Sequence, residues 1–353
     1  MKKNISGGFM NHLKRICFLI ILLGFTSQLF GGGQNRAGTS SAPALMIPVG
    51  SQYVAMGGAN VSSVMGLESI FWNPAGVALS NNDADALFSY RQYIADMNMN
   101  FIAASGNLGF GVLGISFRNL NVGDINVTTM DQPDGTGEVL SPTYFVLGLT
   151  YANALTDRIS IGASVNLVNE SWGKVNASGL SFDLGVQYQN IFAIPDLSIG
   201  IAVKNLGGSM QYEGSGLWTT ATDPNSDRGL TYYQVQASEF ELPSTISLGV
   251  SYKRELNEEN SISIASTFNN NNFSYDNYRV GAEYSFNNTL FIRGGYLFSP
   301  DAADNTPNIY EDFSAGIGIN FGSISNVNIN LDYAYIPVEF FDTNHSFTIR
   351  MGF

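Results

Sequence analysis

The stretch that decides the fold is STISLGVSYK, residues 244–253. Its apolar side chains are Ile246, Leu248, Val250 and Tyr252, and small or polar residues stand between them. Successive side chains of a β-strand point to opposite faces, so this alternation places every apolar side chain on one face. An apolar face opposite a polar one is typical of a strand in a membrane β-barrel, where the outer face meets lipid.

The same alternation recurs after Asp83, for example in residues 159–167, 197–204 and 313–321. About fourteen segments of roughly ten residues follow it, the length that a tilted strand needs to cross the hydrocarbon core. They begin near Ala84, Asn98, Gly109, Thr143, Arg158, Ala177, Asp196, Ser244, Ser261, Tyr275, Thr289, Asp312, Asn326 and Thr343. The sequence therefore predicts an all-β fold, a transmembrane antiparallel β-barrel over residues 84–353.

The lengths of the links between these segments support the prediction. Short links such as 106–108 and 287–288 alternate with long ones, notably 121–142, 207–243 and 299–311. Outer-membrane barrels have short periplasmic turns and longer extracellular loops. An even number of strands in this phase predicts that both termini lie on the periplasmic side.

Composition argues against other classes of protein. The chain has 353 residues, 38 of them Gly, with 13% charged residues and a net charge of -13. An acidic chain without a basic face is not expected to bind nucleic acid. A soluble β-sandwich could also show alternation, but its outward faces would carry charge, whereas the apolar faces here are nearly free of it.

The N-terminal residues 1–33 predict a signal peptide. Lys14 and Arg15 precede the apolar run 16–23, and small residues follow it. This is the pattern of a secretory leader, with cleavage expected near residues 28–33. An uncleaved anchor is the alternative, although the run is short for a membrane-spanning helix. Secretion followed by barrel insertion predicts the outer membrane of a bacterial cell, with lipid around the barrel.

Residues 34–83 are glycine-rich and too irregular for a lipid-facing strand. They contain Gly57 and Gly58 and the motif Trp72-Asn73-Pro74-Ala75-Gly76. Alone, Asn-Pro followed by Gly is only a common turn signal. At these residues the sequence resembles the FadL-like superfamily of outer-membrane barrels, and within it the PorV/PorQ family, whose members begin with a comparable stretch.

The resemblance covers essentially the whole chain after the leader. It implies fourteen strands preceded by an N-terminal hatch inside the barrel, and the strand count from the alternation agrees with it. A hatch requires close approach between its backbone and the wall, which glycines permit. The glycines expected to face inward are Gly148, Gly162, Gly185, Gly200, Gly249, Gly281, Gly316 and Gly318.

The C-terminus ends on alternating apolar residues, Phe347, Ile349, Met351 and Phe353. It resembles the signal by which the barrel-assembly machinery recognises its clients, so that machinery is an expected partner.

Charged residues are also expected inside the barrel, as an ion-pair network or as a polar path or latch for the hatch. They are Arg118, Asp183, Lys204, Lys253, Arg279, Glu283, Arg293, Asp332 and Arg350. Acidic residues in the loops, such as Asp301 and Asp304, match no ordered metal-binding loop. Ser-His-Asp and Gly-x-Ser-x-Gly patterns are missing and His345 stands alone, so neither an enzyme, a cofactor nor a metal is predicted.

The longest link contains Tyr212, Leu217, Trp218, Tyr232 and Tyr233 among polar residues. These side chains could anchor a partner protein or fold back over the barrel mouth, and the sequence leaves both open.

Two functions follow from the resemblance. The PorV/PorQ family implies a type IX secretion accessory protein that docks cargo, with secreted proteins and other components of that system as partners. The wider FadL-like superfamily implies the alternative, a transporter of hydrophobic small molecules. The alternative predicts an apolar pocket under the loops and a lateral opening in the wall.

Overall fold

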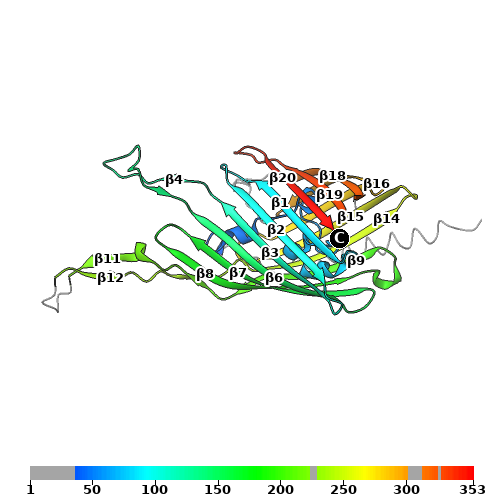
Figure 1. The fold of residues 1–353 in the computed structure, drawn as a ribbon, viewed down its shortest axis with the longest axis horizontal. Helices are drawn as coiled ribbons and strands as arrows, with labels where there is room; N and C mark the ends of the chain where they lie inside the picture. Colours follow the sequence, from blue (N-terminus) through cyan, green and yellow to red (C-terminus); the bar gives the residue numbers. More distant parts are fainter. Residues whose placement is uncertain (1–35, 223–228, 301–311, 325–326) are drawn as a thin grey trace, which may run out of the picture.

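The computed structural model describes residues 36–222, 229–300, 312–324 and 327–353, and fourteen antiparallel strands close into one barrel (Figure 1). The strands are β1 (Ala84–Gln92), β2 (Asn98–Asn107), β3 (Val112–Asn121), β6 (Thr143–Ala154), β7 (Ile159–Ser171), β8 (Asn176–Tyr188), β9 (Leu197–Gly207), β14 (Thr245–Glu255), β15 (Asn260–Asn271), β16 (Asn277–Phe286), β17 (Leu290–Phe298), β18 (Phe313–Ile324), β19 (Val327–Ile336) and β20 (Asn344–Gly352). The predicted leader, 1–33, and the loop residues Asp301 and Asp304 lie outside the described residues.

The predicted fold class is confirmed, and each strand begins close to its predicted start. The largest difference is at β3, predicted near Gly109 and observed from Val112. The reason is local: Gly109 and Gly111 have positive φ and form the turn that precedes the strand. Alternation with a period of two residues therefore predicts the strands, but it does not mark where this turn ends and β3 begins.

The two faces of the wall have the predicted character. In β14, Thr245, Ser247 and Ser251 are buried toward the lumen, whereas Ile246 is 44% exposed on the outer surface. This inverts the burial pattern of a soluble protein. Lipid favours the arrangement because a charged side chain on the outer face would cost about 2–4 kcal/mol at the bilayer midplane.

The barrel closes between its first and last strands. β1 pairs with β20 from Asp85↔Gly352 to Arg91↔Ser346, and the Asp83 N–H donates to the Phe353 carbonyl at 3.0 Å. Closure satisfies the backbone groups of both edge strands.

Longer connections gather at one end of the barrel and include three hairpins. β4 (Ile125–Asn126) pairs with β5 (Val139–Leu140), β10 (Met210–Gln211) with β13 (Glu239–Phe240), and β11 (Trp218–Ala221) with β12 (Thr231–Gln234). The β4 and β11–β12 hairpins project from the same end, at the left of Figure 1. The asymmetry of loop lengths identifies this end as extracellular.

The residues before the barrel form short helices: η3 (Pro43–Met46), α2 (Ser51–Ala55), α3 (Ser69–Trp72) and η4 (Pro74–Leu79). η5 (Ile191–Ala193) and η6 (Ser215–Leu217) lie in loops. η4 contacts β6, β7 and β8, whereas α2 contacts β17, β18, β19 and β20. Residues 36–83, here named the hatch segment, therefore lie across the lumen between distant parts of the wall.

Among the residues that the structure describes, no helix has the length and apolar character needed to cross a membrane.

The apolar core lies between the hatch segment and the inner face of the wall. Leu45, Val49 and Ile70 of the hatch segment cluster with inward residues of the strands such as Met99 and Phe101. A second cluster joins α2 and Trp72 to the opposite wall. Burial of each such aliphatic side chain stabilises the fold by about 1.5–3 kcal/mol.

The two ends of the barrel lie where the strand count predicts, whereas the predicted position of the N-terminus lies outside the described residues. The two ends of the barrel, Ala84 and Phe353, do lie together at the periplasmic end. Arg36, however, pairs with Glu241 at 2.9 Å and donates to Asn272 at 3.2 Å, both at the extracellular end. The strand count places only the barrel ends, whereas the hatch segment runs through the lumen from the other side.

Candidate functional site

The motif Trp72–Gly76 joins two short helices by means of its own side chains. α3 ends at Trp72, the next residue, Asn73, has an extended backbone, and η4 begins with Pro74. Proline suits a first helical position because it lacks an N–H that would be unsatisfied there. The Asn73 side chain accepts the Ala75 N–H at 3.2 Å, which caps η4.

Asn73 also connects the hatch segment to the wall. Its Nδ2 donates to the carbonyl of Val61 at 2.8 Å, to that of Val186 in β8 at 3.2 Å and to that of Ile201 in β9 at 3.4 Å. Trp72 Nε1 donates to the Val49 carbonyl at 3.1 Å within the hatch segment. The motif is thus a structural junction between the hatch segment and the inner face of the wall.

Inward glycines let this junction approach the wall. A Cβ at Gly185 would overlap the Asn73 side chain, and one at Gly162 would overlap the backbone of Pro74. The same holds elsewhere for Gly200, Gly281 and Gly316 against the hatch segment, with Gly249 at a looser 3.2 Å. Gly148 and Gly318 instead face side chains of neighbouring strands.

Gly57 and Gly58 of the hatch segment lie against the opposite side of the wall. The Gly57 N–H donates to Ser314 Oγ at 3.0 Å. Gly57 also packs against Gly295, a residue that the sequence did not single out. Gly58 has φ +75° and faces Trp72 and Arg279, so a side chain there would be strained and obstructed.

Four of the predicted inward charges form one ion-pair chain. Arg293 binds Glu283 at 2.6 Å and Asp332 at 2.6 Å, and Arg350 binds Asp332 at 2.7 Å. These residues come from β16, β17, β19 and β20, and the pair Arg293–Asp332 passes over Gly318 of the intervening strand β18. Of the remaining predicted charges, Arg118, Asp183 and Lys204 gather elsewhere. Arg279 lies over the Trp72 ring, 5.9 Å from its centroid, and Lys253 is exposed near the periplasmic rim.

Glu68 belongs to this charged region, and the sequence analysis missed it. Its side chain is 0% exposed. The Gln52 N–H faces its carboxyl, but within the described ranges neither carboxyl oxygen completes a hydrogen bond of normal geometry. Burial, reinforced by Asp332, raises its pKa to about 7 against the opposing effect of Arg350 and Arg293. An isolated acidic residue in a segment of small and apolar residues was the signal that could have identified it.

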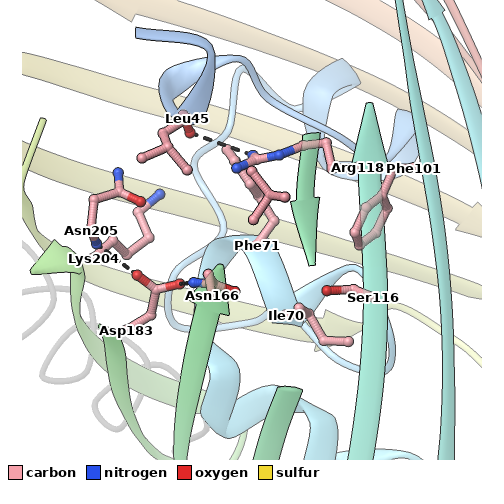
Figure 2. Close-up of a pocket in the computed structure, with 11 residues that line it drawn as sticks. Leu45, Ile70, Phe71, Phe101, Ser116, Arg118, Asn166, Asp183, Lys204 and Asn205 are labelled. Atoms are coloured by element: carbon pink, nitrogen blue, oxygen red, sulfur yellow. Dashed lines mark hydrogen bonds between the residues drawn. The ribbon is translucent and has the colours of Figure 1, made fainter. Parts of the chain in front are cut away.

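A small cavity lies between the hatch segment and the wall (Figure 2). Its volume is about 30 Å³. The lining residues are Leu45, Ile70 and Phe71 of the hatch segment and Phe101, Ser116, Arg118, Val146, Asn166, Asp183, Lys204 and Asn205 of the wall. Two cations stand over the Phe71 ring, the Arg118 guanidinium at 5.3 Å and the Lys204 ammonium at 4.6 Å from its centroid.

The predicted partner-binding residues do not act as one group. Trp218 and Tyr232 are 58% and 73% exposed on the β11–β12 hairpin, and their rings lie 6.4 Å apart. Tyr233 is exposed on the other face of the same hairpin. Tyr212 instead donates its hydroxyl to Glu170 at 2.6 Å, and Leu217 is half-buried.

An apolar hollow of about 350 Å³ lies on the outer wall across β6, β7, β8 and β9. It arises where the small Ala163 stands between the larger Tyr151 and Leu184 in one cross-strand row. The strands stay paired beneath it, with Gly162 opposite Gly185, so the hollow does not open into the lumen.

In the part of the chain that the structure describes, no cluster of three or more His, Cys, Asp or Glu side chains could hold a metal ion.

Comparison with known proteins decides the family. The family model described as "Type IX secretion system protein PorV" matches residues 31–271, more than half of the chain. The chain belongs to the PorV family. It is therefore a bacterial outer-membrane barrel associated with type IX secretion. The junction motif Trp72–Gly76 lies within the matched region.

Solved structures with this fold include the Ralstonia pickettii toluene transporter TbuX, at 15% identity and a TM-score of 0.55, covering 86% of this chain and 98% of that one. The CymD monoaromatic hydrocarbon channel matches at 15% identity and 0.53, covering 87% and 97%. A Pseudomonas aeruginosa FadL homologue matches at 12% and 0.52, covering 87% and 98%. At such low identities, these solved structures and this PorV family member are alike in fold alone. No curated protein sequence matches the chain.

Proposed function

We propose that this PorV family barrel docks secreted cargo at the cell surface through its extracellular hairpins. The observation that carries the proposal is the aromatic face of the β11–β12 hairpin. All eight residues of its two strands are exposed, and Trp218 and Tyr232 share one face. A free hairpin with a large aromatic face has few contacts of its own to stabilise it, whereas Trp and Tyr are enriched among residues that dominate binding energy.

A second hairpin at the same end supports the proposal. Met130, between β4 and β5, is fully exposed, and Ile125 and Val139 are 43% and 50% exposed. Both hairpins project beyond the extracellular rim (Figure 1). Together they offer apolar side chains to a partner on either side of the barrel mouth.

The filled lumen also favours docking over passage of a solute. Residues of the hatch segment such as Ala55, Val64 and Val77 are completely enclosed. The cavity beside Phe71 has about 30 Å³, whereas a cavity that binds benzene has about 150 Å³. The hollow on the outer wall has the volume for an apolar ligand but faces lipid. These features weigh against the alternative of hydrophobic small-molecule transport.

The test is binding of a purified carboxy-terminal cargo domain to the full barrel in lipid nanodiscs. The double substitution W218A/Y232A is expected to weaken binding at least about tenfold, since removal of two aromatic anchors typically costs 2 kcal/mol or more. The matched control is T219A/T231A, which alters the opposite face of the same hairpin. Equal losses in both variants would argue against an aromatic docking face.

Secretion in cells provides the second readout. A strain without the gene is expected to lose proteins with a shared C-terminal sorting domain from its surface and to accumulate them in the periplasm. An unchanged secretome, together with lost uptake of toluene or fatty acids, would replace the proposal with solute transport.

A further inference from the structure

The cavity beside Phe71 has an unbalanced charge. Arg118 and Lys204 carry positive charge into it, whereas Asp183 is its one acidic lining residue. A third cation, Arg279, faces the same Trp72 ring as Lys204, with its guanidinium 5.9 Å from the ring centroid. The described residues around this cavity therefore carry an excess of positive charge.

Asp183 does not neutralise the cations by direct pairing. Its Oδ1 accepts the Asn205 N–H at 2.6 Å, and its Oδ2 accepts Asn166 Nδ2 at 2.8 Å. Within the described part of the chain, neither cation lies within 4.0 Å of the carboxylate as an ion pair. The hydrogen bonds of Asp183 thus serve to fix the wall, and Figure 2 shows its carboxylate turned toward Asn166 and Asn205.

An irregularity in the wall brings Lys204 to this position. The pairing of β8 with β9 shifts between Phe182/Leu206 and Leu184/Val203, so that Lys204 and Asn205 stand opposite Asp183 alone. Asn205 adopts φ +57°. Such a β-bulge redirects side chains, and here both residues of the bulge line the cavity.

The other contacts of the two cations are weak. Arg118 Nη1 donates to the Leu45 carbonyl at 3.4 Å, and the neutral Tyr144 hydroxyl faces the same guanidinium. The Lys204 ammonium lies over the rings of Phe71 and Trp72, at 4.6 and 5.6 Å from their centroids. An aromatic face attracts a cation but leaves its charge uncompensated, and charge removed from water requires a counter-charge.

We propose that the cavity binds one small monovalent inorganic anion, of the size of chloride, between Lys204 and Arg118. Its volume of about 30 Å³ accommodates one water-sized ion. The anion joins β3 and β9 to the cavity face of the hatch segment at Leu45 and Phe71. It therefore stabilises the seating of the hatch segment, independently of cargo docking.

Thermal unfolding of the full barrel in detergent tests the proposal. The melting temperature is measured at constant sodium concentration while chloride replaces gluconate, an anion too large for the cavity. We expect the melting temperature of the parent protein to rise with chloride and to saturate. Lys204→Met is expected to abolish this rise, whereas Lys253→Met, an equal charge change at the exposed periplasmic rim, is expected to retain it.

Two results would overturn the proposal: a parent protein indifferent to the exchange of chloride for gluconate, or loss of the response in both lysine variants. Stabilisation by laurate without stabilisation by chloride would equally refute it, in favour of an amphipathic carboxylate. Should Lys204→Met fail to fold, bromide-soaked crystals of the parent protein decide the matter. An anomalous peak between Lys204 and Arg118 is expected, and an empty cavity at saturating bromide would refute the site.

Discussion

At the scale of single residues, Asn73 and Glu68 show two ways in which a polar side chain can be buried. The amide of Asn73 finds carbonyl partners in the hatch segment and in two strands. The carboxyl of Glu68 lies in the same segment and faces the Gln52 N–H, but in the described residues it completes no hydrogen bond of normal geometry. A satisfied buried amide stabilises the fold, whereas an unsatisfied carboxylate opposes it.

Replacing Asn73 with Ala is expected to lower the free energy of unfolding by about 2–3 kcal/mol, because several hydrogen bonds are lost and buried carbonyls lose their donor. Guanidinium unfolding in detergent micelles measures the change. Asn169→Ala, which removes one exposed hydrogen bond to Ser178, is the control and should change little. An equal effect of both substitutions would contradict the assignment of Asn73 as the junction.

Glu68 predicts a dependence of stability on pH. Its pKa is raised from 4.5 to about 7 in the folded protein. Between these values the folded state binds more protons than the unfolded state, so the contribution of this group to stability falls as pH rises through the window. The groups that face it are Arg350, Asp332 and Arg293 on the wall and Tyr53 in α2.

Glu68→Gln removes this titration. Its melting temperature is expected to vary less than that of the parent between pH 5 and 8, and at pH 8 the variant should be the more stable, by an amount on the order of 3 kcal/mol. Glu258→Gln, in an exposed periplasmic turn, should leave the pH profile unchanged. A parallel pH profile for Glu68→Gln and the parent protein would show that Glu68 does not titrate in this range.

At the scale of elements, the two faces of the strands differ. The outer face presents apolar side chains to lipid, and the inner face presents small or polar ones to the hatch segment. β7, β8 and β9 show this most clearly, because glycines on their inner faces admit the backbone around Pro74 and Val61. The loss of side-chain packing at a glycine is offset by the close approach of the hatch segment.

Gly185→Val is expected to displace Asn73 and to destabilise the barrel by at least about 3 kcal/mol, since overpacking against a fixed backbone relaxes poorly. Gly106→Val is the matched control because a Cβ at Gly106 meets no atom within 4 Å. Melting temperature and the heat-modifiable fraction on gels measure both variants. Equal behaviour would mean that the hatch segment adapts to an altered wall.

At the scale of the whole molecule, closure of the barrel depends on its last strand. β20 pairs with β1 and β19, and Phe347, Ile349 and Phe353 are exposed toward lipid. The identity of these residues as a recognition signal for the assembly machinery stays a prediction. Exposure on the outer face is compatible with such a role.

Phe353→Ala is expected to reduce the fraction of assembled barrel in the outer membrane severalfold, measured by heat-modifiable mobility of membrane fractions. Phe321→Ala removes an aromatic ring of similar exposure, 50% against 54%, from a different strand. It should assemble like the parent protein. A similar loss in both variants would assign the effect to lipid contact in general.

The sequence alone determined the wall of this protein. Alternation with a period of two residues gives the positions of the strands and the side chains that face lipid, and the links between the strands alternate between short and long. Every strand shows the same pattern because each one has lipid on its outer face and the lumen on its inner face. The same rule placed Arg293, Asp332 and Arg350 on the inner face, where the structure pairs them.

Only the tertiary structure decided what meets inside the barrel. Asn73 reaches Val186 and Ile201, Lys204 reaches Phe71, and Arg36 lies at the extracellular end. These contacts join residues far apart in the chain, and no periodicity records them. They depend on how an irregular segment packs against a closed wall, where steric fit and the pairing of buried polar groups select one arrangement.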